Sequence, residues 1–190
     1  MSFIKNIVQK RKTERMPDWH FKFMNIIFHV IDFIYPYIDK RVKKFGVKPG
    51  MTVVDYGCGP GRYTTRFARL VGRHGKVFAV DIHELAVEAV KKKIDKYGLT
   101  NIEAVLASGY DSTLPDTIAD VVCALDMFFM VKKPAEFLAE LKRITKNSGC
   151  LVIDDGHQPR SVTKANILQS GHWDILEETR DHLKCKPNYT

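Results

Sequence analysis

The sequence predicts an α/β fold with a seven-stranded, mostly parallel sheet, helices on both faces and an antiparallel hairpin at its C-terminal end. Residues 52–61 read as a buried strand followed by a glycine turn, and apolar strand patterns then alternate regularly with helical ones. Near the C-terminus, only a tight turn separates two strand patterns. Such a turn joins antiparallel strands, because a parallel crossover needs a dozen or more residues.

The elements follow in order from residue 50. The expected strands are 52–55, 77–81, 102–107, 120–125, 150–154, 175–179 and 182–186. The expected helices are 61–71, 84–97, 134–145 and 161–169. Gly98 follows the second helix and Pro134 opens the third, which are common positions for these residues at helix ends. The strand at 120–125 is nearly all apolar, as a strand buried on both faces should be.

The glycine turn suggests a nucleotide-type site, because glycines let the backbone pass close to a ligand. Asp81 ends the second strand, and an ionised carboxylate can accept hydrogen bonds from both hydroxyls of a ribose. A dinucleotide fingerprint would need its third glycine at the position of Arg62. The turn instead has the form G-x-G-x-G, with Gly57, Gly59 and Gly61 following Asp55.

The segment VVDYGCGPGRYT, together with Asp81 and the closing hairpin, resembles the class I S-adenosylmethionine-dependent methyltransferases, particularly their type 11 small-molecule branch. The resemblance covers about residues 45–187. It implies a Rossmann-like fold, S-adenosylmethionine as the cofactor and methyl transfer to a small, partly apolar acceptor (EC 2.1.1.-).

The same resemblance implies which residues hold the cofactor, at the carboxyl ends of the strands. The segment after Asp55 would bind the amino-acid end of S-adenosylmethionine, and Asp81 its ribose. The family often has an acid after the third strand, where this chain has Ser108-Gly-Tyr-Asp111. The complete set of expected cofactor residues is Asp55, Gly57, Cys58, Gly59, Gly61, Asp81, Ile82, Ser108, Gly109, Tyr110, Asp126 and Met127.

Methyl transfer needs little chemical assistance from the protein, because the methyl group of the sulfonium is already activated. The main contribution of the protein is to position the acceptor. A general base helps only if the acceptor is a hydroxyl or a protonated amine. His157 and Asp126 are the catalytic candidates, at expected strand ends. A divalent metal held by Asp126, Asp154 and Asp155 is an alternative, but adjacent residues of an extended strand point apart, and no metal is expected.

Residues 1–45 are expected to form a basic, helical N-terminal segment, and residues 46–190 the catalytic domain. Residues 1–48 carry eleven Lys/Arg against four Asp/Glu, a net charge of +7, whereas the remainder carries +1. A helix is expected over 19–35, ended or kinked by Pro36. It has a narrow polar stripe and is otherwise apolar. The stripe consists of Lys22, Asn25, His29 and Asp32.

Three interpretations of this segment stay open. It could pack on the edge of the domain as core, or form a lid whose aromatic residues line the acceptor pocket. It could also contact an anionic membrane surface weakly, helped by the shorter stretch of apolar and basic residues between 3 and 12.

The cysteines are far apart and lack a C-x-x-C pair, which predicts free thiols in a reducing cytosol and a cytoplasmic protein. They are Cys58, Cys123, Cys150 and Cys185. The segment Leu125–Phe129 lacks the asparagine-proline-proline-tyrosine signature of base and amide methylation, so no nucleic-acid partner is expected. A non-catalytic binding module and a macromolecular acceptor remain the alternatives.

Overall fold

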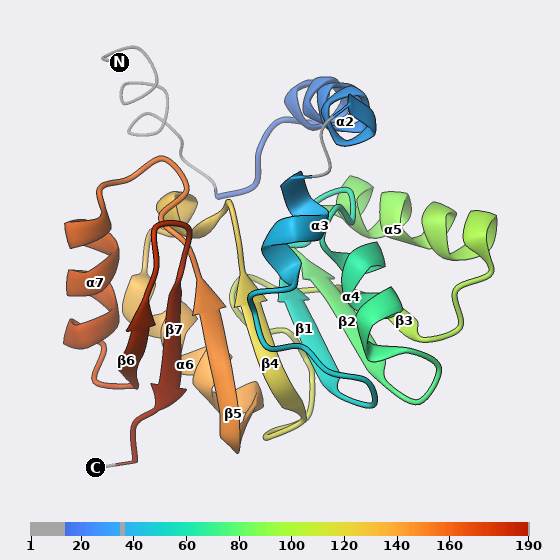
Figure 1. Cartoon of the computed structure of the whole chain (residues 1–190). Helices are drawn as coiled ribbons and strands as arrows, with labels where there is room; N and C mark the ends of the chain where they lie inside the picture. Colours follow the sequence, from blue (N-terminus) through green and yellow to red (C-terminus); the bar gives the residue numbers. More distant parts are fainter. Residues whose placement is uncertain (1–13, 35–36, 190) are drawn as a thin grey trace.

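The computed structural model describes residues 14–34 and 37–189, and within them seven strands form one sheet (Figure 1). The strand order is β3-β2-β1-β4-β5-β7-β6; β1 to β5 pair in parallel, and β7 is antiparallel to both β5 and β6. The strands are β1 (Thr52–Tyr56), β2 (Lys76–Asp81), β3 (Ile102–Leu106), β4 (Ala119–Ala124), β5 (Thr145–Ile153), β6 (Trp173–Glu178) and β7 (Leu183–Pro187). The predicted parallel sheet and closing hairpin are confirmed.

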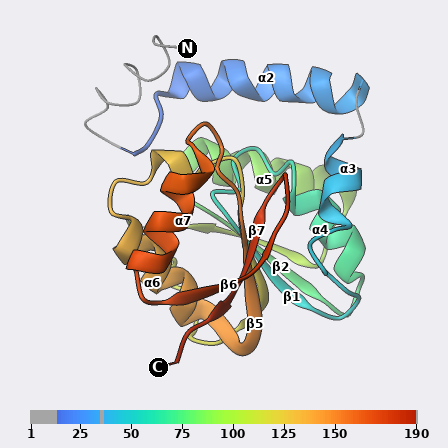
Figure 2. The same cartoon turned by 60° about the vertical axis from the view of Figure 1, so that its left-hand side comes forward.

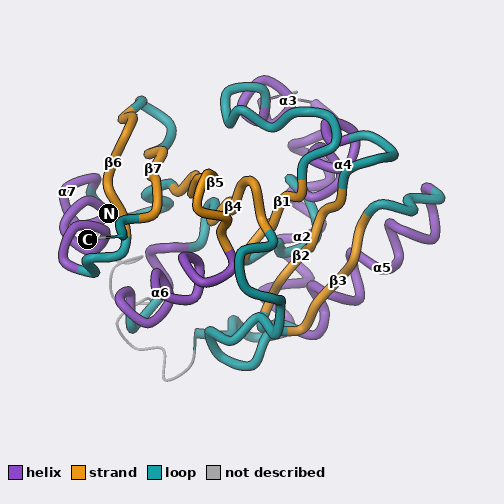
Figure 3. The backbone as a smooth tube through the Cα atoms, turned by 90° about the horizontal axis from the view of Figure 1, so that it is seen from below, coloured by secondary structure: helices purple, strands orange, loops and turns teal. Residues whose placement is uncertain are grey.

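Helices cover both faces of the sheet. The described helices are α2 (Asp18–Ile34), which lies apart from these faces (Figure 2), α3 (Tyr37–Val42), α4 (Thr64–Val71), α5 (Glu84–Tyr97), α6 (Pro134–Ile144) and α7 (Arg160–Gln169), with a short 3₁₀ helix, η1 (Phe128–Met130). Seen from below, α3 and α4 lie on one side of the row of strands and α6 on the other (Figure 3). Among the described residues, no helix combines the length and apolar character that crossing a bilayer requires.

Strand alternation divides the core into two layers, because successive side chains point to opposite faces. Val53 and Val121 belong to the cluster formed with α3 and α4, whereas Val54 and Val122 belong to the cluster formed with α6 and α7. Phe45, which follows α3, is fully buried in the first cluster. The division of the chain at residue 45 therefore stays a prediction, drawn through a region that packs into the core.

The starts of two elements differ most from the prediction, each for a local reason. The helix expected from residue 61 begins at Thr64, because the glycine turn keeps left-handed backbone angles as far as Gly61. The strand expected from Cys150 begins at Thr145, the last residue of the predicted preceding helix, since Thr145 pairs with Ala119 across a register shift. The sequence patterns also missed η1 and α3, both of which are too short to show a clear period.

The sheet order reverses between β1 and β4, so the loops that follow these strands diverge and leave a crevice at the carboxyl edge. Helix α2 runs along this same edge, at the top of the molecule (Figure 2). The expected helix over 19–35 is confirmed within one residue over the described range, although Tyr35 and Pro36 lie outside it. Residues 1–13, with the short amphipathic stretch, also lie outside the described residues.

Candidate functional site

The glycine turn after β1 is fixed by hydrogen bonds to the end of β2. All three glycines have left-handed backbone angles, with φ of +75° at Gly57, +51° at Gly59 and +80° at Gly61. The Gly57 N–H donates to the carbonyl of Val80 over 2.8 Å. The Gly59 N–H donates to Oδ2 of Asp81 over 2.9 Å. The carboxylate of Asp81 thus holds the turn in place at the mouth of the crevice.

The three glycines meet different surroundings. A Cβ on Gly57 would lie 2.7 Å from Cγ of Met127, and one on Gly61 would lie 3.1 Å from Cγ2 of Val90. A Cβ on Gly59 would meet no atom within 4 Å. A side chain at Gly57 or Gly61 would therefore crowd neighbouring side chains inside the protein. Gly59 presents a bare backbone to open space, as a cradle for a ligand would.

Asp81 and His83 shape the side of the crevice next to the turn. Oδ1 of Asp81 accepts from the His83 N–H over 2.9 Å, and burial raises the pKa of the Asp81 carboxyl. Nδ1 of His83 accepts the Leu85 N–H and caps α5. The His83 ring packs against Phe21 of α2, with the ring centroids 4.8 Å apart. The end of β2 therefore contacts the N-terminal helix directly.

A pocket of about 150 Å³ opens at this place, between the sheet edge and the N-terminal segment. Nine of the residues expected to hold the cofactor line it: Gly57, Cys58, Gly59, Asp81, Ile82, Gly109, Tyr110, Asp126 and Met127. The lining also includes Tyr56, Tyr63, Leu125, Met130, Val131 and Phe137, which the sequence patterns do not single out. From the N-terminal segment it includes Glu14, Arg15, Met16, Phe21 and Met24, and Phe21 is one of the aromatic residues that the lid interpretation expects there.

Four predicted residues do not line the pocket. Asp55 lies behind the glycine turn, where it accepts a hydrogen bond from the Thr64 hydroxyl over 2.5 Å, and burial raises its pKa to about 7. Gly61 is buried against α5. Ser108 is exposed and pairs with Asp111 across a tight turn. His157 is exposed, with its ring edge-on to Phe129 at 4.8 Å.

A buried guanidinium, Arg41 of α3, organises the end of the pocket at the C-terminus of β4. Its Nη2 contacts Oδ2 of Asp154 at 2.5 Å, and its Nη1 lies 3.3 Å from Oδ1 of Asp126 and also donates to the Tyr63 hydroxyl. The Tyr63 hydroxyl donates in turn to Oδ2 of Asp126 over 2.9 Å. The sequence contained no periodic signal for Arg41, because α3 is short and its partners are distant along the chain.

The two carboxylates of this network differ in exposure. Asp154 is buried, and its Oδ1 accepts from the backbone N–H groups of Asp126 and Gly156. Burial and the nearby Asp126 raise the pKa of Asp154 despite the attraction of Arg41. Asp126 has a left-handed φ of +58°, and its side chain is 48 % exposed toward the pocket. The network therefore fixes one carboxylate in the core and presents the other to a ligand.

The acids considered for a metal ion have cationic partners instead. Arg41 binds Asp126 and Asp154, whereas Nε of Arg160 contacts both carboxylate oxygens of Asp155 at 2.7–2.8 Å. Among residues 14–34 and 37–189, no group of three or more His, Cys, Asp or Glu side chains is arranged to hold a metal.

The segment before α2 crosses the pocket and is tied to its opposite rim. The Glu14 carboxylate accepts from the Tyr110 hydroxyl and from the Lys132 N–H, the latter over 2.6 Å. On the other side, Nη2 of Arg15 contacts Glu84 at 2.8 Å and Asp18 at 2.9 Å. Residues 14–18 are thus bound by hydrogen bonds and ion pairs to the segments that follow β2, β3 and β4.

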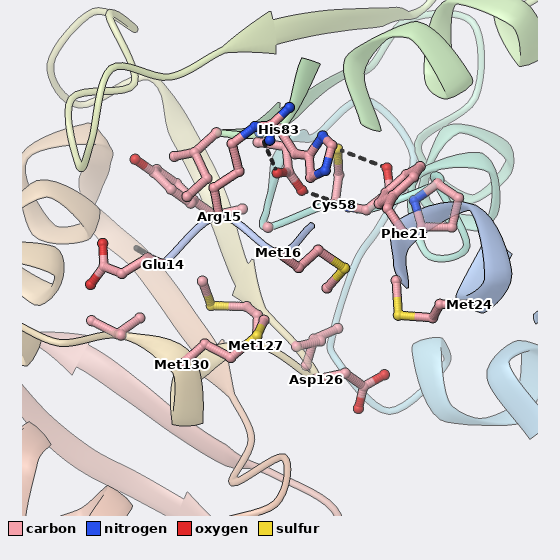
Figure 4. Close-up of a pocket in the computed structure, with 18 of the residues that line it drawn as sticks. Glu14, Arg15, Met16, Phe21, Met24, Cys58, His83, Asp126, Met127 and Met130 are labelled. Carbon is pink, nitrogen blue, oxygen red and sulfur yellow. Dashed lines mark hydrogen bonds between the residues drawn. The ribbon is translucent and has the colours of Figure 1, made fainter. Parts of the chain in front are cut away.

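From Met16 onward, this segment lines the pocket with apolar side chains. Figure 4 shows Met16 and Met24 on one side of the pocket and Met127 and Met130 on the other, with Phe21 beside Cys58. Phe21 is only 4 % exposed. Flexible thioethers adapt readily to flat apolar partners, so this half of the pocket suits an apolar or aromatic molecule.

Comparison with known proteins matches residues 47–184 to a family described as "Methyltransferase domain". The ubiquinone/menaquinone biosynthesis C-methyltransferase UbiE of Escherichia fergusonii is 30% identical over 130 residues, which are 67% of this chain and 52% of that protein. UbiE of a Marinomonas species is 28% identical over 136 residues, 71% of this chain and 54% of its own length. The chain thus spans about half the length of the curated relatives it matches.

Solved structures share the fold. A SAM-dependent methyltransferase from Aquifex aeolicus superposes with a TM-score of 0.71 at 29% identity, covering 78% of this chain and 88% of that one. A TehB-like SAM-dependent methyltransferase from Corynebacterium glutamicum has a TM-score of 0.69 at 14% identity, covering 92% of this chain and 100% of that one. At that identity, the second match shows the fold alone.

Proposed function

This chain belongs to the class I S-adenosylmethionine-dependent methyltransferases, and we propose that it transfers the methyl group to a small, partly apolar acceptor by in-line displacement. One observation supports this acceptor class above all. The pocket joins a polar side, formed by the glycine turn and Asp81, to an apolar side formed by methionines and aromatic rings. Asp126 is also part of the lining.

The residues fit the cofactor of this family. We assign the turn at Gly57 and Gly59 to its amino-acid end, Asp81 to its ribose, and Ile82, Gly109 and Tyr110 to the surroundings of its adenine. Asp55 would act from behind the turn, by holding Thr64 and the backbone in place. When bound, S-adenosylmethionine supplies an activated methyl sulfonium, which leaves positioning and exclusion of water to the protein.

Asp126 is the residue we assign to orienting the acceptor. Its carboxylate faces the pocket and is held by Tyr63 and Arg41, so it can accept a hydrogen bond from an acceptor hydroxyl or ammonium group without moving. Such a bond also makes the donor atom a better nucleophile. His157 does not line the pocket, and its role as a base stays a prediction from the sequence.

Titration calorimetry tests the cofactor assignment, with S-adenosylmethionine and S-adenosylhomocysteine as ligands and NAD as the control. We expect micromolar binding of the first two and none of NAD. Radiolabelled methyl transfer to phenols and naphthols, with and without an alkyl chain, then tests the acceptor class. Cofactor binding without transfer to any of them, or transfer to polar amines alone, would contradict the acceptor assignment. Absence of cofactor binding would favour a non-catalytic module.

A matched pair of glycine substitutions tests the cradle. Gly59 and Gly98, the latter after α5, both have left-handed φ and open space where a Cβ would stand. Because that backbone conformation costs a residue with a Cβ about 1–2 kcal/mol, Gly59→Ala and Gly98→Ala should lower the free energy of unfolding similarly. Only Gly59→Ala should weaken S-adenosylhomocysteine binding, by roughly tenfold or more. Equal affinities in calorimetry would remove Gly59 from the site.

A further inference from the structure

The outward face of α2 exposes a stripe of large apolar side chains. Trp19 is 71 % exposed, Phe23 60 % and Ile27 38 %. Their spacing of four residues places them on one side of the helix. Phe21 is buried on the other side, and Met24 lines the pocket there. The first half of α2 thus has apolar side chains both toward the pocket, at Phe21 and Met24, and on the exposed side, at Trp19 and Phe23. The helix itself lies at the top of the molecule (Figure 2).

Isolated exposed apolar residues are ordinary, but a contiguous stripe that includes tryptophan marks an interaction surface. A tryptophan at the start of a helix is typical of segments that lie at the boundary between lipid and water, where its ring has both an apolar body and a polar N–H. The stripe also borders a polar side of the same helix, where Lys22 is exposed.

The charge of the segment indicates which partner fits the stripe. Residues 1–48 carry a net charge of +7 in the sequence, and the rest of the chain only +1. Within the described part of this segment, Lys22 on α2 is exposed, whereas Arg15 and Arg41 already pair with acids. Asp18, an acid next to the stripe, is already paired with Arg15. A second copy of this chain docking on the same face would bring two segments of +7 together, which repel. A surface of anionic lipid instead attracts the basic residues and accepts the apolar ones.

We propose that the outward face of α2, defined by Trp19, Phe23 and Ile27, docks the protein on a bilayer that carries anionic lipid. The helix lies in the interface plane without crossing the bilayer, as amphipathic helices with basic flanks do. Since the opposite side of α2 walls the pocket, docking brings the pocket next to the membrane. An acceptor dissolved in lipid could then enter beside Met24; this last step rests on the proposed function.

Fluorescence of the full chain with lipid vesicles provides the test. Trp19 is exposed, whereas Trp173 is 1 % exposed in the core, so a blue shift on vesicle binding reports on α2. We expect the shift, and cosedimentation, with vesicles of phosphatidylcholine and phosphatidylglycerol in equal parts. Neutral phosphatidylcholine vesicles should bind much less, and high salt should release the protein, because screening weakens the attraction between the basic segment and the lipid.

Two double variants distinguish vesicle binding through the outward face of α2 from nonspecific binding by any exposed apolar side chain. Phe23→Ser with Ile27→Ser keeps Trp19 as the reporter and should lower the vesicle partition coefficient at least tenfold. Leu168→Ser with Leu176→Ser removes two side chains on α7 and β6 that are each 57 % exposed, and should change it little. Lys22→Glu should weaken binding to anionic vesicles alone.

Several results would overturn the proposal. They are absence of vesicle binding by the unmodified protein, equal binding by the Phe23/Ile27 variant, or a dimer in light scattering that Phe23→Ser dissociates. Calorimetry with S-adenosylhomocysteine on the same samples keeps the two proposals apart. Intact cofactor binding without vesicle binding would contradict the membrane-docking proposal alone. Vesicle binding without cofactor binding would contradict the proposed function alone.

Discussion

Replacing Arg41 with methionine is expected to destabilise the fold by about 3–5 kcal/mol, the usual cost of leaving a buried charge without its partner. The substitution keeps most of the apolar stem but leaves Asp154 in the core without a cation. It also removes one of the two groups that hold Asp126. Since small domains are stable by only about 5–15 kcal/mol, the loss should be large in denaturant unfolding followed by circular dichroism.

The pH dependence of that loss identifies its cause. Burial already raises the pKa of Asp154, and removal of Arg41 should raise it further. The folded variant would then bind a proton at a pH where the unfolded chain does not, so its stability should rise as the pH falls through the folded-state pKa. The deficit relative to the unmodified protein should therefore be largest above that pKa and shrink below it.

Two further variants test whether the lost stability comes from the ion pair between Arg41 and Asp154. Asp154→Asn alone keeps an oxygen for the N–H groups of Asp126 and Gly156 while removing the charge. Combined with Arg41→Met, it should recover a substantial part of the lost stability, so the two substitutions should not be additive. Two results would contradict the prediction: additive losses of unfolding free energy in the double variant, or a loss below about 1 kcal/mol in Arg41→Met. Either would mean that the buried ion pair of Arg41 and Asp154 contributes little to the stability of the fold.

The residues that the sequence could predict are those with a local signature. The glycine turn and Asp81 follow strands whose apolar runs are long enough to recognise, and the parallel order of these strands brings the turn and Asp81 to one edge. The pocket-lining positions of Gly57, Gly59 and Asp126 therefore follow from their place at the carboxyl ends of these strands, together with the family resemblance. Asp55 also has this signature, but a strand end does not reveal whether its side chain faces the crevice or lies behind the turn.

The residues that the sequence could not predict act through contacts between distant segments. Arg41 meets Asp154 across 113 residues, and Glu14 meets Lys132 across 118. Neither contact produces a periodic pattern in the sequence. Each depends instead on how a short loop or a short helix packs against the folded sheet. The interpretation of the N-terminal segment was open for the same reason. Phe21 and Trp19 are equally apolar in sequence, yet one is buried beside the pocket and the other faces outward.

Replacing Asp81 with alanine is expected to weaken S-adenosylhomocysteine binding by roughly two orders of magnitude. The estimate takes a hydrogen bond to a charged group as worth about 1.5–3 kcal/mol, with tenfold in affinity for each 1.4 kcal/mol. The fold should survive, because Asp81 is only partly buried and the N–H groups it binds, on Gly59 and His83, lie at the pocket edge. Asp116→Ala, at an exposed acid after β3, is the control and should leave the affinity unchanged.

A loss of affinity in Asp81→Ala could arise from a loosened glycine turn as well as from a missing ribose partner, and a second ligand separates the two causes. The 2′-deoxy analogue of S-adenosylhomocysteine lacks one hydroxyl of the ribose. In the unmodified protein it should bind more weakly than the parent ligand, because Asp81 loses a donor. In Asp81→Ala the two ligands should bind equally well, since no carboxylate remains to distinguish them. An equal deoxy penalty in both proteins would mean that Asp81 acts only by holding the Gly59 N–H. The ribose would then have to be bound by another residue of the pocket.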